Sequence, residues 1–299
     1  MAAAKLSVTE GFVSSLEPPR NLLGLSHCWR CEPTDMIGRA MLIVISPAKK
    51  LDYETPVPAK RHTMPTMLDR SAELVDVMVT KTPNDLAELM HLSPALADLN
   101  AERFQDWDPD FGPNNARQAI FAFNGDVYQG LDAATFDTRD LTAAQKRLRI
   151  LSGLYGVLRP LDLMRPYRLE MGTRLATARG KDLYEFWGDD ITDRLNADLA
   201  NNNFKVLVNL ASNEYFGSVR TDRLDARVVS PRFLDEKDGQ FKVMAFFAKR
   251  ARGAMTGWLI RERIKSPKAL TEFDGLGYHY DPARSTPDEP VFVRPEAAR

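Results

Sequence analysis

The sequence has very little cysteine. Cys28 and Cys31 are the only two cysteines among 299 residues, and both lie in the segment CWRC. A C-x-x-C pair supplies half of a zinc site or a redox couple, but there is no second pair, and His27 is the only histidine nearby. We therefore expect no function for the pair. The absence of cysteine from residues 41–299 suits a reducing cytoplasm and excludes a thiol nucleophile there.

Long apolar runs and the common catalytic motifs are missing as well. No run reaches about 18 apolar residues, the length of a membrane-spanning helix, and the first residues lack the pattern of a secretory signal. The motifs H-E-x-x-H, G-x-S-x-G, G-x-x-x-x-G-K-[ST] and G-x-G-x-x-G are absent. His62, His91 and His279 are scattered, which argues against a histidine-based metal site. We expect a cytoplasmic protein with no membrane partner, no cofactor and no bound metal.

The composition that is present, 44% hydrophobic and 27% charged, is typical of a globular protein. Residues 1–40 mix small, polar and proline residues without a sustained period. We expect them to be a disordered extension, which translation starting at Met41 would leave out. Residues 41–299 contain no internal repeat and no break in composition. They are predicted to form a single domain of mixed α/β type, in the α+β class.

Apolar runs and helical periods mark the elements of that domain. Asn84 and Ser93 stand where helix N-caps belong, and Pro94 would take a first helical position. Residues 241–247 fit either a strand or the start of a helix. Strands are predicted at 42–45, 205–212, 226–234 and about 291–293, and helices over 68–78, in two parts of 84–107, and over 248–264.

Positive charge is concentrated in two segments, although the net charge of the chain is −1. Residues 242–268 hold eight Lys and Arg against one Glu, and residues 139–168 hold seven against two Asp. Tyr155, Tyr167 and Trp258 lie among them. These segments are either solvated faces or the walls of a cleft that binds phosphates and stacks bases.

Isolated polar residues follow or interrupt several apolar runs. Polar groups at the ends of buried strands commonly build sites, but a buried, hydrogen-bonded scaffold would use the same residues. Arg168 and Glu170 are two apart, so on a strand they would point to the same side and could form an ion pair. The set comprises Lys49, Asn124, Arg168, Glu170, Asn209, Ser212, Asn213 and Glu214.

Six segments resemble the YaaA family of bacterial peroxide-stress proteins. They are ISPAK (45–49), FNGDVYQGL (123–131), ILSGLYGVLRPLDLMRPYRLEMG (150–172), LYEFWGDDIT (183–192), NLASNEYF (209–216) and KRARGAM (249–255). The resemblance extends from Met41 to about Arg294. It implies a cytosolic protein that protects cells during hydrogen peroxide stress and is linked to lowered free iron and to DNA binding.

The resemblance also implies an unusual topology with a positively charged cleft and a helix-hairpin-helix element. Residues 84–107 match that element best, although they contain no glycine; LSGLYG (151–156) has the glycines and matches in part. Residues 152–172 would form a wall of the cleft, where their glycines and prolines shape irregular backbone.

Two functions follow from these observations. The leading one is DNA binding without strong sequence preference, with single-stranded or distorted duplex DNA favoured. Tyr155 and Tyr167 would stack on bases, Asn124, Asn209 and Ser212 would form the cleft floor, and phosphates would be bound by Lys49, Arg159, Arg168, Lys249, Arg250 and Arg252.

The alternative is an enzyme that acts on a nucleobase, a nucleotide or another small substrate. Phosphate binding has no use for carboxylates, whereas a general acid or base would be such a group. The catalytic candidates are Glu170, Glu214 and Lys49. Direct iron binding by carboxylates is a third idea, which no His and carboxylate spacing supports.

Overall fold

The computed structural model describes residues 40–299. The predicted disordered extension over residues 1–40, with Cys28 and Cys31, therefore lies outside the described residues apart from its last position. The boundaries of the predicted domain stay a prediction. The mixed α/β class is confirmed, because the described part of the chain combines several sheets with helices.

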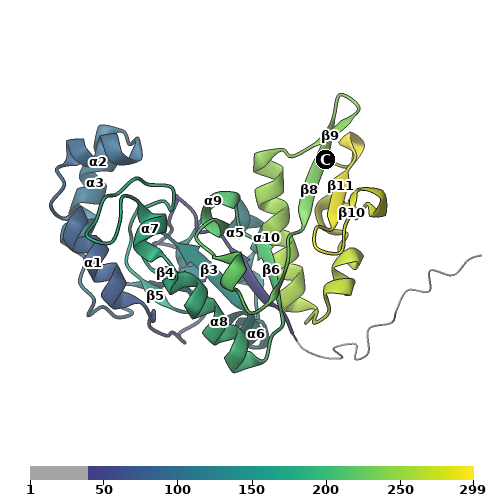
Figure 1. Cartoon of the computed structure of the whole chain (residues 1–299), viewed down its shortest axis with the longest axis horizontal. Coiled ribbons are helices and arrows are strands. Elements are labelled where there is room, and N and C mark those ends of the chain that lie inside the picture. Colours follow the sequence, from purple (N-terminus) through teal and green to yellow (C-terminus); the bar gives the residue numbers. More distant parts are fainter. Residues whose placement is uncertain (1–39) are drawn as a thin grey trace, which may run out of the picture. The chain divides into compact units, whose positions relative to one another are not determined.

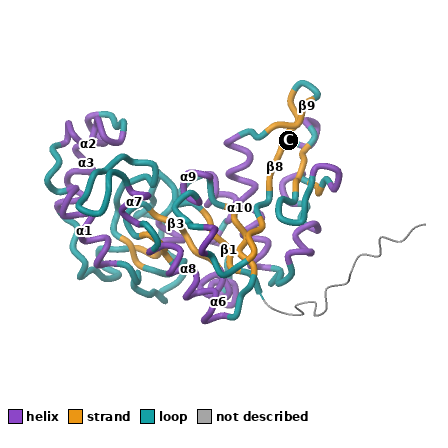
Figure 2. The backbone as a smooth tube through the Cα atoms, in the orientation of Figure 1, coloured by secondary structure: helices purple, strands orange, loops and turns teal. Residues whose placement is uncertain are grey.

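A five-stranded sheet forms the centre of the described residues (Figure 2). Its order is β4-β3-β1-β6-β7, with β1 parallel to both β3 and β6, β6 parallel to β7, and β4 antiparallel to β3. The central strand β1 is buried on both faces, which explains its unbroken apolar run. The strands are β1 (Leu42–Ile45), β3 (Leu148–Ser152), β4 (Gly156–Leu158), β6 (Val206–Leu210) and β7 (Arg227–Val229).

The order of this sheet reverses between β1 and β6. From β1 the chain continues to β3 on one side, and from β6 it continues to β7 on the other. In open α/β sheets, ligands bind beyond the carboxyl ends of the strands at such a reversal. Ser46 follows β1 and Ser212 follows β6, and the Ser212 backbone N–H donates to Ser46 Oγ at 2.8 Å. The topology thus brings two of the polar strand ends together.

A second sheet has the order β10-β11-β8-β9, and a two-stranded ribbon pairs β2 with β5. Asp235 and Arg294 form a buried ion pair at 2.6 Å in the second sheet, and Tyr278 Oη donates to Asp235 at 2.7 Å. The strands are β2 (Arg117–Gln118), β5 (Leu163–Met164), β8 (Arg232–Lys237), β9 (Gln240–Lys242), β10 (His279–Tyr280) and β11 (Val291–Arg294).

Helices surround the five-stranded sheet (Figure 1). The group α1 to α3 lies toward one end of it, and α10 with the second sheet lies toward the other. The α-helices are α1 (Leu68–Met78), α2 (Pro83–Met90), α3 (Pro94–Gln105), α4 (Ala119–Ala122), α5 (Asp126–Leu131), α6 (Thr138–Arg147), α7 (Leu183–Trp187), α8 (Asp190–Asn202), α9 (Asn213–Phe216) and α10 (Ala245–Arg261). The 3₁₀ helices are η1 (Ala133–Thr135), η2 (Thr221–Arg223), η3 (Pro267–Glu272), η4 (Gly275–Gly277), η5 (Pro282–Arg284) and η6 (Glu296–Ala298).

Several predicted boundaries differ from the observed ones for local reasons. Helix α2 is capped by Thr82 rather than Asn84, because Thr82 and Asp85 form a reciprocal capping box. The predicted strand 226–234 is two strands in different sheets, β7 and β8, separated at Pro231. Residues 241–247 are divided between the end of β9 and the start of α10.

Helices α5 and α10 touch backbone to backbone. A Cβ at Gly253 would lie 1.8 Å from the Val127 carbonyl oxygen, and a Cβ at Gly130 would lie 2.0 Å from the Arg250 carbonyl oxygen. A Cβ at Gly257 would lie 2.8 Å from the Leu131 carbonyl oxygen. Glycine is required at these positions because only a residue without a side chain permits this approach.

The Gly253→Ala variant should be strongly destabilised. Its methyl group has no space, so α10 must move away from α5, at a cost of about 3 kcal/mol in the free energy of unfolding. We expect a midpoint of thermal unfolding lower by about 6–12 °C. Gly112→Ala is the matched control, since nothing lies within 4 Å of its Cβ position. Equal midpoints for the two variants would contradict the close contact.

Candidate functional site

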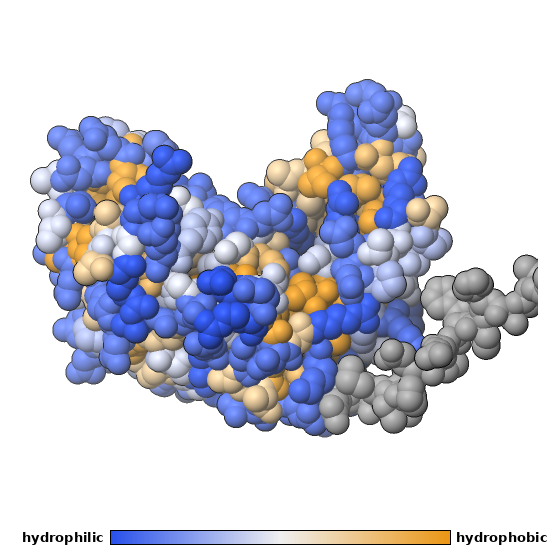
Figure 3. Space-filling model, in the orientation of Figure 1, coloured by the Kyte–Doolittle hydropathy of each residue, from blue (hydrophilic) through white to orange (hydrophobic). Residues whose placement is uncertain are grey.

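A pocket of about 460 Å³ lies at the carboxyl ends of β1 and β6. Its lining comes from the loop after β1, the start of α5, residues 167–170, the start of α9 and one face of α10. Figure 3 shows the surface hollowed between the α2–α3 end and the β8–β9 end, and α9 lies in this hollow in Figure 1. The pocket therefore occupies the position that the reversal of the sheet order predicts.

The floor of the pocket is held by hydrogen bonds between the two strand ends. Ser46 Oγ donates to Ser212 Oγ at 3.2 Å, in addition to accepting the Ser212 N–H. Tyr128 Oη, from α5, donates to the Ser46 carbonyl at 3.1 Å. The Asn124 N–H donates to the Lys50 carbonyl at 2.9 Å, which joins the loop after β1 to the start of α5. Three separate segments thus form one rigid base.

Lys49, Arg168 and Glu170 form a charged group on one wall. Lys49 Nζ lies 2.6 Å from Glu170 Oε2, and Arg168 Nη2 lies 3.3 Å from Glu170 Oε1. The Lys49 side chain is 63% exposed, whereas that of Glu170 is 23% exposed. Arg168 Nε is buried and has no hydrogen-bond partner among the described residues. The Glu170 carboxylate binds both cations of this wall.

Glu214 and two tyrosines complete this wall. Glu214 Oε1 accepts the Gly172 N–H at 3.0 Å. Burial raises the pKa of Tyr167 and Tyr215, and neighbouring tyrosines add to both shifts, as do Glu214 and Glu170 for Tyr215. Both phenols therefore stay protonated at neutral pH, and the Tyr167 hydroxyl already shares a hydrogen bond with Ser152.

Three cations at the pocket lack an acidic partner within the described residues. They are Lys50, Lys249 and Arg252, none of which has a carboxylate within ion-pair distance there. Lys249 and Arg252 lie on α10, three residues apart, and so share a face of the helix. Burial lowers the pKa of the Arg252 guanidinium, yet such a group stays charged at neutral pH. This positive charge is available to an anion.

The structure brings most of the sequence-predicted site residues together. Those that line the pocket are Lys49, Asn124, Tyr167, Arg168, Glu170, Ser212, Glu214, Lys249 and Arg252. Tyr155, Arg159, Asn209 and Arg250 do not line it. Sequence reasoning missed Lys50, Asp126 and Gln129 as lining residues. Their signals were weak: Lys50 is next to Lys49, and the other two follow the Asn-Gly turn that begins at Asn124.

The tyrosines named as stacking candidates are packed in the interior. Tyr155 is fully buried, and its hydroxyl accepts from Trp107 Nε1 and from the Arg165 N–H, each at 3.0 Å. Tyr167 is 5% exposed and shares a hydrogen bond of 2.6 Å with Ser152. Trp258 packs edge-on against Phe273. Tyr155 therefore has no exposed ring face on which a base could stack. Tyr167 exposes only a small part of its side chain, at the pocket.

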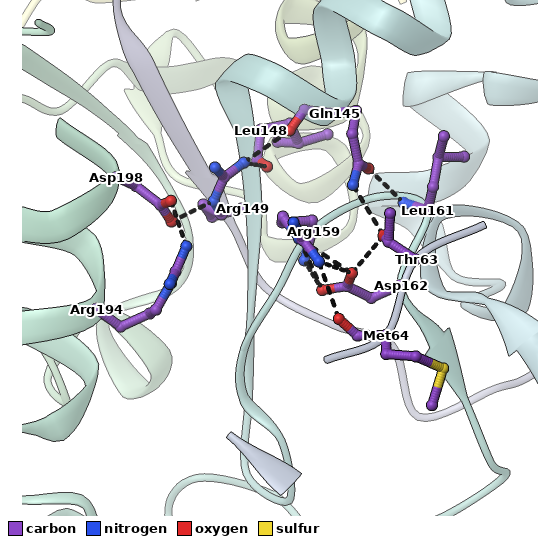
Figure 4. Close-up of polar contacts among 10 residues, drawn as sticks. All are labelled: Thr63, Met64, Gln145, Leu148, Arg149, Arg159, Leu161, Asp162, Arg194 and Asp198. Carbon is purple, nitrogen blue, oxygen red and sulfur yellow. Dashed lines mark hydrogen bonds and ion pairs between the residues drawn. The ribbon is translucent and has the colours of Figure 1, made fainter. Parts of the chain in front are cut away.

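Three arginines of the basic segment 139–168, Arg147, Arg149 and Arg159, serve the interior of the fold, and Figure 4 shows two of them, Arg149 and Arg159. Arg159 pairs with the buried Asp162 at 2.9 Å and donates to the Met64 carbonyl. Arg149 pairs with Asp198 at 2.7 Å, and both side chains are nearly inaccessible. Buried charges of this kind need partners, which explains why the arginines point inward. Their positive charge is not available to a ligand.

Asn209 and Arg250, which were also predicted as site residues, lie outside the pocket lining. Asn209 Oδ1 accepts the Ala211 N–H at 3.0 Å, and its Nδ2 donates to Ser230 at 3.3 Å, so it shapes the turn after β6. Arg250 is exposed on α10, one residue beyond Lys249 and outside the pocket lining.

Helices α2 and α3 are the two helices predicted within 84–107, separated by a turn at His91–Ser93. Asp85, Glu88, Asp98 and Glu102 lie on them against one arginine, Arg103. This excess of negative charge is unfavourable for binding phosphate. A helix-hairpin-helix function for α2 and α3 stays a prediction. The same function for residues 151–156 also stays a prediction.

Residues 40–299 lack two further features. That part of the chain contains no group of three or more His, Cys, Asp or Glu side chains placed to hold a metal ion. None of its helices has the length and apolar character needed to cross a membrane.

The chain matches one protein-family model, described as peroxide stress protein YaaA. The match covers residues 41–284, which is more than half of the chain and includes every lining residue of the pocket. It confirms the resemblance seen in the six sequence segments. The chain therefore belongs to the family of peroxide stress protein YaaA.

Proposed function

We propose that this peroxide stress protein binds DNA without strong sequence preference, and that the pocket at the carboxyl ends of β1 and β6 holds one unpaired nucleotide. The observation that carries the proposal is the convergence of Lys50, Lys249 and Arg252 on this pocket without acidic partners among the described residues. Arg252 is partly buried, and a partly buried cation without a partner loses hydration and gains nothing in return. A phosphate at the pocket would supply the missing interaction.

The size and polarity of the pocket favour a single nucleotide over an intact duplex. Small-molecule sites typically enclose about 300–1,000 Å³, and this one encloses about 460 Å³. Asn124, Gln129 and Ser212 supply donors and acceptors suited to the edge of a base. A base enters such a pocket most easily from single-stranded or distorted DNA, because stacking and pairing are already lost there. Protection of DNA during peroxide stress would follow from this binding.

We propose that the pocket does not hold iron, and that the lowering of free iron is a consequence of the stress response. Asp126, Glu170 and Glu214 are the carboxylates of the lining. They are outnumbered by the five cations Lys49, Lys50, Arg168, Lys249 and Arg252. An excess of positive charge opposes the entry of a metal cation.

A second candidate function is catalysis on the bound nucleotide or nucleobase. The observation that favours it is the Lys49–Glu170 contact of 2.6 Å within the pocket. Binding of a phosphate backbone needs no carboxylate, whereas a carboxylate can serve as the general acid or base in proton transfer.

Removing the unpaired charge of α10 should weaken DNA binding and reduce its dependence on salt. For the double variant Lys249→Ala, Arg252→Ala, we expect about tenfold lower affinity for single-stranded DNA at low salt. The slope of log K against log salt concentration should fall by about 1.4, because each lost phosphate contact contributes about 0.7. Fluorescence anisotropy across a salt series measures both quantities.

Lys205→Ala is the control for that experiment. Lys205 is exposed and immediately precedes β6, so it lies at the amino end of the strand whose carboxyl end borders the pocket. The control removes the same kind of charge and should leave affinity and slope unchanged. A wild-type protein with weak or salt-insensitive DNA binding would contradict the proposed function.

The Glu170→Gln variant separates binding from catalysis. Neutralising this carboxylate releases Lys49 and Arg168, so DNA affinity should rise by a few-fold at low salt. If the protein acts by binding, the survival of peroxide-treated cells that carry the variant should match the wild type. Loss of protection with intact DNA affinity would favour the enzyme. Glu289→Gln, in an exposed pair with Arg232, is the control.

A further inference from the structure

An aromatic ring is exposed beside the unpaired cations of α10. Phe246 lies in the first turn of the helix and is 52% exposed, and Val243, just before the helix, is 53% exposed. Most large apolar side chains among the described residues are buried, so this exposure has no explanation in packing. Lys242, Lys249 and Arg250 are exposed around it, and none has a carboxylate partner among the described residues. An apolar face framed by positive charge fits a base attached to a phosphate backbone.

The helical spacing places this ring next to the pocket. Phe246 precedes Lys249 by three residues and Gly253 by seven, so the three share one side of α10. Gly253 contacts Val127 near the start of α5, and the preceding residues Gly125 and Asp126 line the pocket. The turn that holds Phe246 extends beyond the start of α5, which leaves the ring uncovered. A strand with one nucleotide in the pocket would therefore place a neighbouring base near Phe246.

The ring is held in place before any ligand binds. Phe246 meets Phe247 edge to face, with centroids 5.4 Å apart. The guanidinium of Arg294 lies 4.5 Å from the centroid of Phe247, and that of Arg299 lies 5.8 Å from it. Phe247 is thus fixed from the side of the second sheet, and it supports Phe246. A ring ordered in advance loses little entropy when a base stacks on it.

We infer that Phe246 is the stacking residue for single-stranded DNA, in place of the buried Tyr155 and Tyr167, and that it binds the base next to the nucleotide in the pocket. This inference rests on the proposed function. It adds a binding surface outside the pocket, formed by Phe246 with Lys242, Lys249 and Arg250, which we call the α10 platform.

The test compares two ligands and two proteins. The ligands are a fluorescently labelled oligothymidylate of about ten nucleotides, long enough to cover pocket and platform, and an abasic oligonucleotide of the same length. The proteins are the full-length wild type and its Phe246→Ala variant. Wild type should bind oligothymidylate more than tenfold more tightly than the abasic ligand, because stacking on Phe246 contributes about tenfold and the base in the pocket adds to it. Phe246→Ala should lose the tenfold share that stacking contributes, while its affinity for the abasic ligand stays unchanged.

Two controls make the result specific. Phe246→Leu retains an apolar side chain but loses the aromatic face, so it should behave like the alanine variant. Leu99→Ala removes another exposed apolar side chain, on α3, and should retain the wild-type preference. Thermal unfolding of each variant shows whether the fold is intact, which we expect because Phe246 lies at the surface.

The possible failures are distinct. If wild type binds neither ligand, the proposed function itself is wrong. If wild type binds both equally, or if Phe246→Ala keeps the preference for oligothymidylate, DNA binding stands and the stacking inference is overturned. If Phe246→Ala instead abolishes self-association of the protein in sedimentation experiments and leaves DNA binding unchanged, the ring is a protein contact and the inference is likewise overturned.

Discussion

The backbone contact between α5 and α10 is the constraint on which the pocket depends. Gly130 and Gly253 allow each helix to approach the carbonyl oxygens of the other. The start of α5 supplies Gly125 and Asp126 to the pocket, and α10 supplies Lys249 and Arg252. Because the two helices touch without intervening side chains, the separation of these walls is fixed by the backbone. Packing through larger side chains would allow α10 to slide and the cations to move with it.

The Glu170 carboxylate divides the cations of the pocket into two kinds. Lys49 and Arg168 have their charge balanced by it, whereas Lys50, Lys249 and Arg252 have no such partner in the described part of the chain. A pocket lined only by cations would attract any anion, and one with every cation paired would attract none. The division gives the pocket one polar, nearly neutral wall and one positive wall. A nucleotide has the matching halves, a polar base and a charged phosphate.

The sequence predicts the parts of this arrangement that depend on neighbouring residues. The apolar run of β1, the polar residues after β6 and the helical period of α10 could all be recognised, and so could nine of the residues that line the pocket. The burial of Tyr155, Arg149 and Arg159 could not be predicted in this way. Their burial depends on Trp107, Asp198 and Asp162, and the first two of these partners lie dozens of residues away in the chain. No local pattern distinguishes an arginine that faces a buried aspartate from one that faces solvent.

The exposure of Phe246 could not be predicted from the sequence for a related reason. Within 241–247 the apolar residues fit a strand as well as the start of a helix, and in either case they would be read as core. The three-dimensional arrangement changes this, because α10 extends beyond α5 and the Phe246 side chain in its first turn is left 52% exposed. The carboxylates of α2 and α3 disfavour a phosphate backbone at their end of the sheet, while α10 carries unpaired cations at the other. If the protein binds DNA as proposed, charge and exposure would direct the strand along α10, from the pocket toward Phe246.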